Sequence, residues 1–169
     1  LALRLGWLSS HPEGKPIFDR IRDRYIEIFP FVDDLLEGVD FRQTSPRFYW
    51  NISEYGLVDS FRLGTVSTGM RKTLALLAQI ELCPDNSLIL IDEFENSLGA
   101  NCIDLVAEAV QNAGRGLQFI ITSHHPYIIN RIGAKHWKIV TRKGGVVSTH
   151  TAEELGIGRS RHENFTQLT

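Results

Sequence analysis

The sequence predicts an α/β protein with a mostly parallel sheet flanked by helices and a β-hairpin toward its C-terminal end. Two short apolar runs, LILI at residues 88–91 and the core of LQFIIT at 117–122, are typical of strands in a parallel sheet covered on both faces. Helical spacing of apolar residues precedes each run, and this alternation is the order of α/β folds. The content of 43% hydrophobic and 22% charged residues over 169 positions suits a globular domain with a sizeable core.

Composition and charge exclude several classes of protein. No apolar run approaches the ~20 residues that span a bilayer, so we expect no transmembrane helix and no membrane partner. The N-terminus lacks the pattern of a signal peptide, and a net charge of −2 gives no general attraction to nucleic acid. Cys83 and Cys102 are too isolated for a disulfide framework or a zinc site, which favours a cytoplasmic protein. Because the chain begins at Leu1 and its only methionine is Met70, we expect a piece of a longer protein.

The first 60 residues predict a helix and a small sheet without chemistry of their own. In FDRIRDRYIEIFPFVDDLL, the apolar side chains at helical spacing are Phe18, Ile21, Tyr25 and Ile28. Pro30 ends this run. Strand-like stretches follow around Asp40 to Gln43 and around Arg47 to Ser53, and the second is rich in aromatic residues. We interpret the two stretches as a hairpin or a small sheet.

From Ser67 onward the pattern alternates between helix and strand. A helix with a broad apolar face is expected over MRKTLALLAQIEL, and the turn CPDNS closes it before the strand LILI. CIDLVAEAVQNAG predicts a helix that ends at Gly114, and PYIINRI predicts a short helix after LQFIIT. HWKIVTR and VVSTH, joined by KGG, predict a hairpin. Thr151 and Glu154 have the spacing of a capping box, which predicts a final helix.

Polar residues follow both apolar strands. Asp92 and Glu93 come directly after the first, and the second is followed by Thr122, Ser123, His124 and His125. Ligands of open α/β sheets bind at the carboxyl ends of the strands, so neighbouring strands would bring these groups into one crevice. Asp92 would hold Mg²⁺, Glu93 would orient or deprotonate a water, and a histidine would stabilise the phosphate being cleaved. The alternative is that the acids cap the next helix and the histidine is structural.

The stretch GTVSTGMRKT does not form a phosphate-wrapping loop of the GxxxxGK[ST] type. Gly64 and Gly69 have the right spacing, but Met70 stands at the lysine position. We interpret VSTGMRK as a Ser-x-Gly turn that opens a helix, where the Ser67 hydroxyl, the Gly69 backbone and the helix amides provide an anion site. The alternative is an N-cap serine followed by a permissive glycine.

Taken in order, VSTGMRK, LILIDEFENS and IITSHHP resemble the C-terminal half of ABC-type ATPases. The resemblance is to the branch of SMC, RecF and OLD-like proteins, which are often called AAA-family ATPases. The separations of 25 residues from Ser67 to Asp92 and 31 from Glu93 to His124 are those of the family. The resemblance covers residues 64–142 firmly and the first 60 residues loosely.

The resemblance assigns nucleotide contacts to the Ser-x-Gly turn. Ser67, Thr68 and Gly69 match the family's LSGGQ-type signature, which binds nucleotide. Thr68 departs from the second glycine of that signature, and Met70 departs from its Gln or Glu.

The resemblance also assigns roles after the two strands. Asp92 matches the Walker B aspartate, a ligand of Mg²⁺, and Glu93 matches the catalytic glutamate. Asn96 lies in the D-loop, which contributes to nucleotide binding. His124 matches the switch histidine, whereas His125 takes a place often held by serine.

The fold implied by the resemblance is a partial P-loop NTPase domain. Residues 1–60 would lead into the ATPase lobe, residues 61–150 would form its C-terminal half, and residues 151–169 would be a C-terminal helix or tail. The Walker A loop and the Q-loop of the family lie upstream of these motifs, so we expect them in a segment before Leu1.

The function implied by the resemblance is ATP binding and hydrolysis, with ATP and Mg²⁺, by a head-to-tail homodimer or a higher homo-oligomer. The output would act on DNA or on a partner nuclease or toxin, in antiphage defence or DNA repair. The alternative is a nucleotide-gated scaffold without hydrolysis. The intact Glu93 argues against this alternative, and the departures at Thr68 and Met70 leave some room for it. A transporter's ATPase subunit fits less well, because ENSLGAN is unlike the SALD-type D-loop of those subunits.

Overall fold

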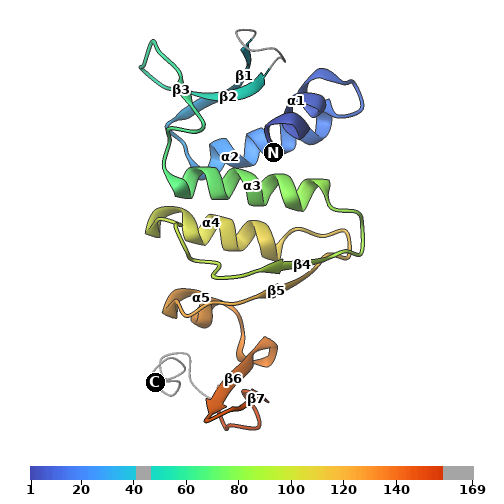
Figure 1. Cartoon of the computed structure of the whole chain (residues 1–169), viewed down its shortest axis with the longest axis vertical. Coiled ribbons are helices and arrows are strands. Elements are labelled where there is room, and N and C mark those ends of the chain that lie inside the picture. Colours follow the sequence, from blue (N-terminus) through green and yellow to red (C-terminus); the bar gives the residue numbers. More distant parts are fainter. Residues whose placement is uncertain (41–46, 158–169) are drawn as a thin grey trace. The chain divides into compact units, whose positions relative to one another are not determined.

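The computed structural model of the chain describes residues 1–40 and 47–157. Two compact units are present: unit 1 contains Leu1–Leu90 and Asn96–Ile120, and unit 2 contains Ile91–Glu95 and Ile121–Thr169. Helices and strands are labelled in Figure 1. The boundaries between the units fall at the ends of strands β4 (Leu88–Ile91) and β5 (Gln118–Ile121).

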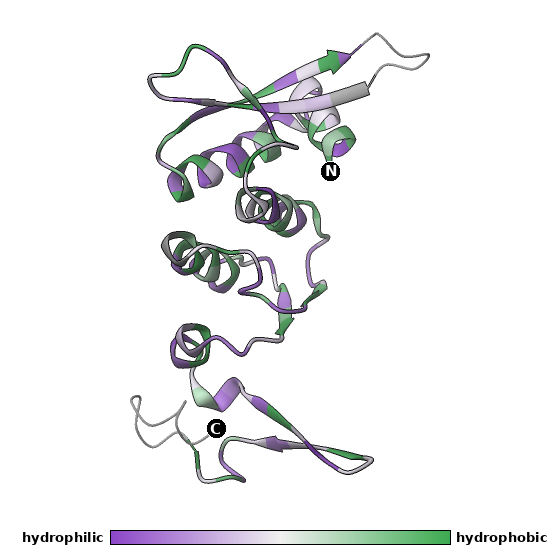
Figure 2. Cartoon of the chain, turned by 60° about the vertical axis from the view of Figure 1, so that its left-hand side comes forward, coloured by the Kyte–Doolittle hydropathy of each residue, from purple (hydrophilic) through white to green (hydrophobic). Residues whose placement is uncertain are grey.

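The core of unit 1 is built from helices that pack on one another (Figure 1). They are α1 (Ala2–Ser10), α2 (Lys15–Ile28), α3 (Thr68–Leu82) and α4 (Ala100–Gln111). Helix α2 packs against the other three, and α3 packs against α4. The four apolar side chains predicted to share one face of α2 are all buried, which confirms this helix. Figure 2 shows both hydrophobic and hydrophilic residues along these helices, and buried apolar side chains such as Leu5, Leu74 and Val106 hold the helices together.

A three-stranded antiparallel sheet in the order β1-β2-β3 completes the N-terminal part of unit 1. Its strands are β1 (Val32–Asp40), β2 (Arg47–Glu54) and β3 (Phe61–Arg62). The strand predicted around Arg47 is confirmed, but the strand predicted from Asp40 already begins at Val32. The register shifts between Val32 and Asp34, and this bulge puts buried Val32 and Leu35 three residues apart, which looks helical in the sequence. Residues 41–46, where the predicted stretch continues, lie outside the described residues.

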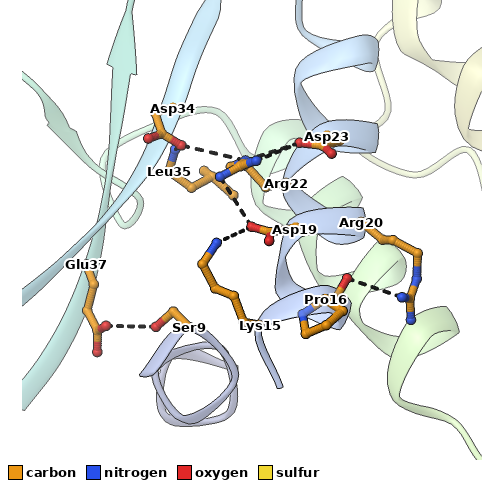
Figure 3. A network of polar contacts seen from close by, with 10 residues as sticks. All are labelled: Ser9, Lys15, Pro16, Asp19, Arg20, Arg22, Asp23, Asp34, Leu35 and Glu37. Carbon is orange, nitrogen blue, oxygen red and sulfur yellow. Dashed lines mark hydrogen bonds and ion pairs between the residues drawn. The ribbon is translucent and has the colours of Figure 1, made fainter. Parts of the chain in front are cut away.

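Polar contacts connect the start of α2 to strand β1 (Figure 3). Lys15 pairs with Asp19 one turn later, and Arg22 contacts Asp19 at 3.3 Å and Asp34 on β1 at 4.0 Å. On α1, the Ser9 hydroxyl donates a hydrogen bond of 2.8 Å to Glu37 on the same strand. Such exposed ion pairs are screened by water and contribute little, so the apolar core carries most of the stability.

Strands β4 and β5 pair with each other and run parallel. The N–H of Gln118 donates to the carbonyl of Ser87, and the N–H of Thr122 donates to that of Ile91, each at 2.9 Å. Both strands advance by four residues between these bonds, which defines parallel pairing and confirms the prediction. The prediction that both faces are covered is wrong for the described residues. Ile89 is 1% exposed, but Leu88 and Leu90 on the other face are 54% and 66% exposed.

Unit 2 contains a short helix and the predicted hairpin. Its elements are α5 (Pro126–Arg131), the 3₁₀ turn η1 (Ala134–His136), β6 (Lys138–Lys143) and β7 (Val146–Thr151). The two strands are antiparallel, with Lys143 opposite Val146 across the loop of Gly144 and Gly145. The φ of Gly144 is 60°, a left-handed conformation that tight hairpin loops require, so the KGG signal correctly located this turn.

The predicted capping box is present at the end of β7. The N–H of Thr151 donates to Glu154 Oε2 at 2.8 Å, and the N–H of Glu154 donates to Thr151 Oγ1 at 3.2 Å. The box closes a turn at residues 152–156, and the rest of the predicted final helix, 158–169, lies outside the described residues. In the part of the chain that the structure describes, every helix is too short or too polar to span a bilayer.

Candidate functional site

The Thr122 side chain organises the two adjacent acids within unit 2. Its hydroxyl donates a hydrogen bond to Asp92 Oδ1 and accepts the backbone N–H of Glu93 at 2.8 Å. The carbonyl of Thr122 accepts the N–H of Phe94 at 3.0 Å, so one residue after β5 holds three consecutive residues after β4. In the sequence Thr122 is only one of several polar residues after a strand, and its position directly after β5 is the signal that could have identified it.

Asp92 and Glu93, the two acids at the end of β4, are both exposed. The next helix, α4, has Gly99 at its N-cap position, so neither Asp92 nor Glu93 caps it. Glu93 has a φ of 46°, in the left-handed region that costs a non-glycine residue of order 1 kcal/mol or more. Such local strain is common at functional sites. A pair of exposed acids held by a hydroxyl at the carboxyl ends of parallel strands is suited to bind a cation and to activate a water.

The two histidines after β5 have different neighbours. His125 Nδ1 accepts the backbone N–H of Tyr127 at 3.3 Å and so caps α5. His124 instead contacts Glu95: its backbone N–H and its Nδ1 each lie 2.9 Å from Glu95 Oε1. The structural alternative therefore describes His125, and the ring of His124 remains available to a ligand.

Glu95 is a residue whose importance the sequence did not reveal, beyond its place in the D-loop segment. Its side chain is 8% exposed. Burial raises the pKa of Glu95, but hydrogen bonds from the Ser123 hydroxyl and the His124 backbone N–H, with the charge of His124, outweigh burial and hold this pKa below its ordinary value. Glu95 is therefore a carboxylate at neutral pH.

The signature residues lie in unit 1, at the start of α3. Ser67 Oγ accepts the N–H of Met70 at 3.2 Å, which is the N-cap geometry of the alternative interpretation. A cap and a ligand contact are compatible, because a hydroxyl has a second lone pair and a proton to offer. A Cβ on Gly69 would overlap the backbone carbonyl oxygen of Ser97, so the glycine permits the close approach of these segments. Thr68 is exposed and accepts a hydrogen bond from Arg71 Nη2 at 3.3 Å.

The D-loop segment contacts the signature helix within unit 1. The carbonyl of Asn96 accepts a hydrogen bond from Lys72 Nζ at 2.8 Å, and its side-chain Oδ1 accepts the Ser97 hydroxyl at 3.2 Å. A groove of about 1010 Å³ opens beside them, and its lining includes Ser67, Gly69 and Ser97. The structure thus groups the predicted residues into two sets, Ser67 to Gly69 with Asn96 in unit 1 and Asp92, Glu93 and His124 in unit 2.

Asp92 is the residue that fits the predicted Mg²⁺. Among residues 1–40 and 47–157 no three His, Cys, Asp or Glu side chains gather into a complete metal cage. Mg²⁺ is usually held by one or two carboxylates and keeps several waters, so an exposed carboxylate with one oxygen fixed by Thr122 suits this ion.

The chain matches the model of a known protein family. The family model described as "AAA domain, putative AbiEii toxin, Type IV TA system" matches residues 11–130, which is more than half of the chain. No curated protein matches the sequence.

Several solved structures share the fold. A chain from a study of ATP-driven dimerization and DNA-stimulated activation of SMC ATPases has a TM-score of 0.61 at 14% identity, covering 85% of this chain and 93% of that one. The Smc head domain with a coiled coil and joint from Pyrococcus yayanosii has a TM-score of 0.59 at 16% identity, covering 90% and 28%. The SmcHead bound to the C-winged helix domain of ScpA has a TM-score of 0.55 at 19% identity, covering 89% and 50%. This chain thus spans half or less of the last two.

At these identities the similarity establishes the fold. Together with the family match it confirms the resemblance to ABC-type and SMC-type ATPases that the three sequence motifs indicate. The family match is independent of the fold comparison and reaches from α1's end to α5. The chain therefore belongs to the AAA domain family and has a partial P-loop NTPase-like α/β fold similar to that of SMC ATPase heads.

Proposed function

We propose that this chain carries the hydrolytic half of an ATPase site. The observation that supports the proposal best is the pair of hydrogen bonds made by the Thr122 hydroxyl, which fix the Asp92 carboxylate and the backbone of Glu93 at the carboxyl ends of two parallel strands. His124 follows two residues after Thr122 in the same unit. An aspartate for the metal, a glutamate for water and a histidine for phosphate are the groups that phosphoryl transfer to water requires.

In the proposed reaction each side chain has one task. Asp92 would hold Mg²⁺, which would supply charge neutralisation at the phosphates of ATP. Glu93 accepts the proton of the attacking water, and His124 donates a hydrogen bond to the γ-phosphate as its charge changes. The phosphates themselves need a backbone cradle of the GxxxxGK[ST] type, and this sequence of 169 residues contains none.

We assign the unit 1 residues to the nucleotide of a second subunit. Ser67 and Gly69 would touch the γ-phosphate bound by the partner, with Asn96 beside them, so that ATP joins two subunits and hydrolysis releases them. The N-terminus of α3 supplies the positive end of a helix dipole for this contact. The related SMC structures concern ATP-driven dimerization, DNA-stimulated activation and ScpA binding, which supports a dimer acting on DNA or on a partner protein. Antiphage defence and DNA repair are the settings we favour, with a nuclease or toxin as partner in the cytoplasm, where free Cys83 and Cys102 persist.

A scaffold that binds ATP without hydrolysis is the second candidate, because Thr68 and Met70 depart from the family signature. The two departures differ in weight. Met70 is 8% exposed, so it packs in the core, whereas Thr68 is exposed at the start of α3. The substitution at Thr68 is thus the observation that favours a scaffold.

Turnover by the Glu93→Gln variant of the full-length natural protein separates these functions. An amide keeps the size of Glu93 but cannot accept the proton of water, so we expect ATP binding to persist while kcat falls by ~10²-fold or more. Glu153→Gln, at an exposed acid on the turn after β7, is the matched control and should hydrolyse ATP at the parental rate. Equal turnover by Glu93→Gln and the parent would contradict the catalytic assignment, and no turnover by the parent would favour the scaffold.

A further inference from the structure

Glu95 connects the loop after β4 to the loop after β5 within unit 2. Its Oε1 receives both the backbone N–H and the ring Nδ1 of His124, each at 2.9 Å. The roles proposed for Asp92, Glu93 and His124 do not explain why Glu95 makes both contacts with His124.

Packing does not hold the ring of His124. The side chain is 86% exposed, whereas that of Glu95 is 8% exposed. An exposed imidazole samples several rotamers unless a polar contact restrains it. In the part of the chain that the structure describes, Glu95 provides this polar contact. Because the side chain of Glu95 is buried, its own position is restrained.

A carboxylate at this position is chemically specific. A neutral amide or hydroxyl could accept the backbone N–H of His124 without the desolvation cost of a buried charge. Besides the Ser123 hydroxyl, the polar group that this negative charge meets is the ring Nδ1 of His124, which lies 2.9 Å away. The choice of glutamate therefore points to the side chain of His124 as its target.

The same contact determines which ring nitrogen meets a ligand. Because a carboxylate accepts at Nδ1, this nitrogen carries a proton in both the neutral ring and the cation. Nε2 is the nitrogen left for a ligand, and it donates a hydrogen bond to a phosphate oxygen when the ring is the cation.

We infer that Glu95 is the positioning residue of His124, fixing the ring through its Nδ1–H so that Nε2 is directed to the phosphate being cleaved. This inference rests on the proposed function, because the ring has this task only if a phosphate is bound. Glu95 itself does not touch the phosphate.

A double-variant comparison in the full-length natural protein tests the inference by kinetics. We expect Glu95→Gln to lower kcat by about 10- to 100-fold with little change in KM for ATP, since misdirected groups lose rate of this order. The combined Glu95→Gln and His124→Ala variant should be no slower than His124→Ala alone, because Glu95 acts through the ring. Losses that multiply in the double variant would overturn the inference, as would full activity of Glu95→Gln.

Glu154→Gln is the matched control. Glu154 is another unit 2 carboxylate that accepts a backbone N–H, from Thr151 at 2.8 Å, so its variant makes the same change of charge and hydrogen bond away from His124. We expect parental kcat in this control. Melting temperatures of all variants show whether a loss of rate reflects loss of folding.

The nitrogen spectrum of the His124 ring tests the positioning without any turnover, so failure of the ATPase proposal stays distinguishable. Long-range ¹H–¹⁵N spectra at a pH where the ring is neutral should show the proton on Nδ1 in the parent and on Nε2 in Glu95→Ala, with the signal assigned by its loss in His124→Ala. A proton on Nε2 in the parent, or the same pattern in both proteins, would overturn the inference. If Glu95→Ala does not fold, the spectrum of the parent and the Glu95→Gln kinetics decide.

Discussion

His124 and His125 are neighbours in the sequence with different contacts, and the difference makes a testable pair. His124→Ala removes the exposed ring that we propose contacts the phosphate, so kcat should fall by ~10²-fold with little change in stability. His125→Ala removes the cap that accepts the N–H of Tyr127, so the free energy of unfolding should fall by about 0.5–2 kcal/mol at nearly parental kcat. Parallel kcat and melting measurements on both variants check this. A large loss of stability in His124→Ala with unchanged kcat would reverse the two roles.

Gly69 and Gly64 provide a matched pair at the signature. A Cβ at Gly69 would meet the carbonyl oxygen of Ser97, whereas nothing lies within 4 Å of a Cβ at Gly64. Gly69→Ala should therefore lower the free energy of unfolding by about 1–3 kcal/mol, the usual cost of overpacking. Gly64→Ala should have little effect. Urea unfolding of the two variants measures the difference, and equal stability would mean that the Ser97 segment moves aside without cost.

At the residue scale, the sequence predicted the acids and the histidine but not the groups that hold them. Asp92, Glu93 and His124 each follow a strand, so their chain positions alone indicate a shared edge. Glu95 and His124 are 29 residues apart, and spacing does not show which of several nearby carboxylates meets the ring. That choice depends on the left-handed turn at Glu93, with its φ of 46°, which periodicity cannot reveal.

Helix α2 contains the group with the clearest dependence on pH. Burial, with the charge of Glu54 adding to it, raises the pKa of Tyr25 far above its ordinary value, and its side chain is 0% exposed. Because the pKa is raised in the folded state, the stabilising contribution is complete below the unfolded value of about 10 and is lost as pH rises above it. We expect the free energy of unfolding to fall from pH 10 upward.

Tyr25→Phe should remove this alkaline loss, because it keeps the ring and deletes the ionisable hydroxyl. That hydroxyl has no hydrogen-bond partner among the described residues, so the variant should fold well at neutral pH. Tyr55→Phe, at a 64% exposed position, is the control and should keep the pH dependence. Denaturation curves between pH 8 and 11 compare the three proteins, and a parallel decline in all of them would assign the effect to other groups.

At the element scale, the helices and strands with a regular sequence pattern were the ones predicted correctly. The α2 and α3 helices and the β6–β7 hairpin have uninterrupted apolar spacing or an explicit glycine turn, and all three were predicted. Strand β1 was not predicted from its true start, because a bulge between Val32 and Asp34 breaks the alternation on which strand prediction depends. The capping box at Thr151 was located correctly although it closes a turn in the described residues.

The assembly of two whole molecules can be tested at Ser67. Ser67→Arg and Ser67→Ala both remove the cap that accepts the N–H of Met70, so both should lose about 0.5–2 kcal/mol of stability. Only the arginine fills the space proposed for the partner's γ-phosphate. We therefore expect ATP-dependent dimers in Ser67→Ala and none in Ser67→Arg. Light scattering with and without ATP checks this, and equal dimerisation of the two variants would count against a composite site.

Strands β4 and β5 leave one face exposed in unit 1, and this exposure affects how the protein behaves in storage. Leu88 and Leu90 on β4 and Ile120 on β5 are 54%, 66% and 57% exposed, and the two strands have no further partner strand among the described residues. An apolar strand pair with open edges is a template for further strands, as in aggregation and amyloid growth. At rising concentration the isolated chain should therefore precipitate or form fibres through this surface before its helices unfold, and its shelf life should depend on concentration more than on temperature.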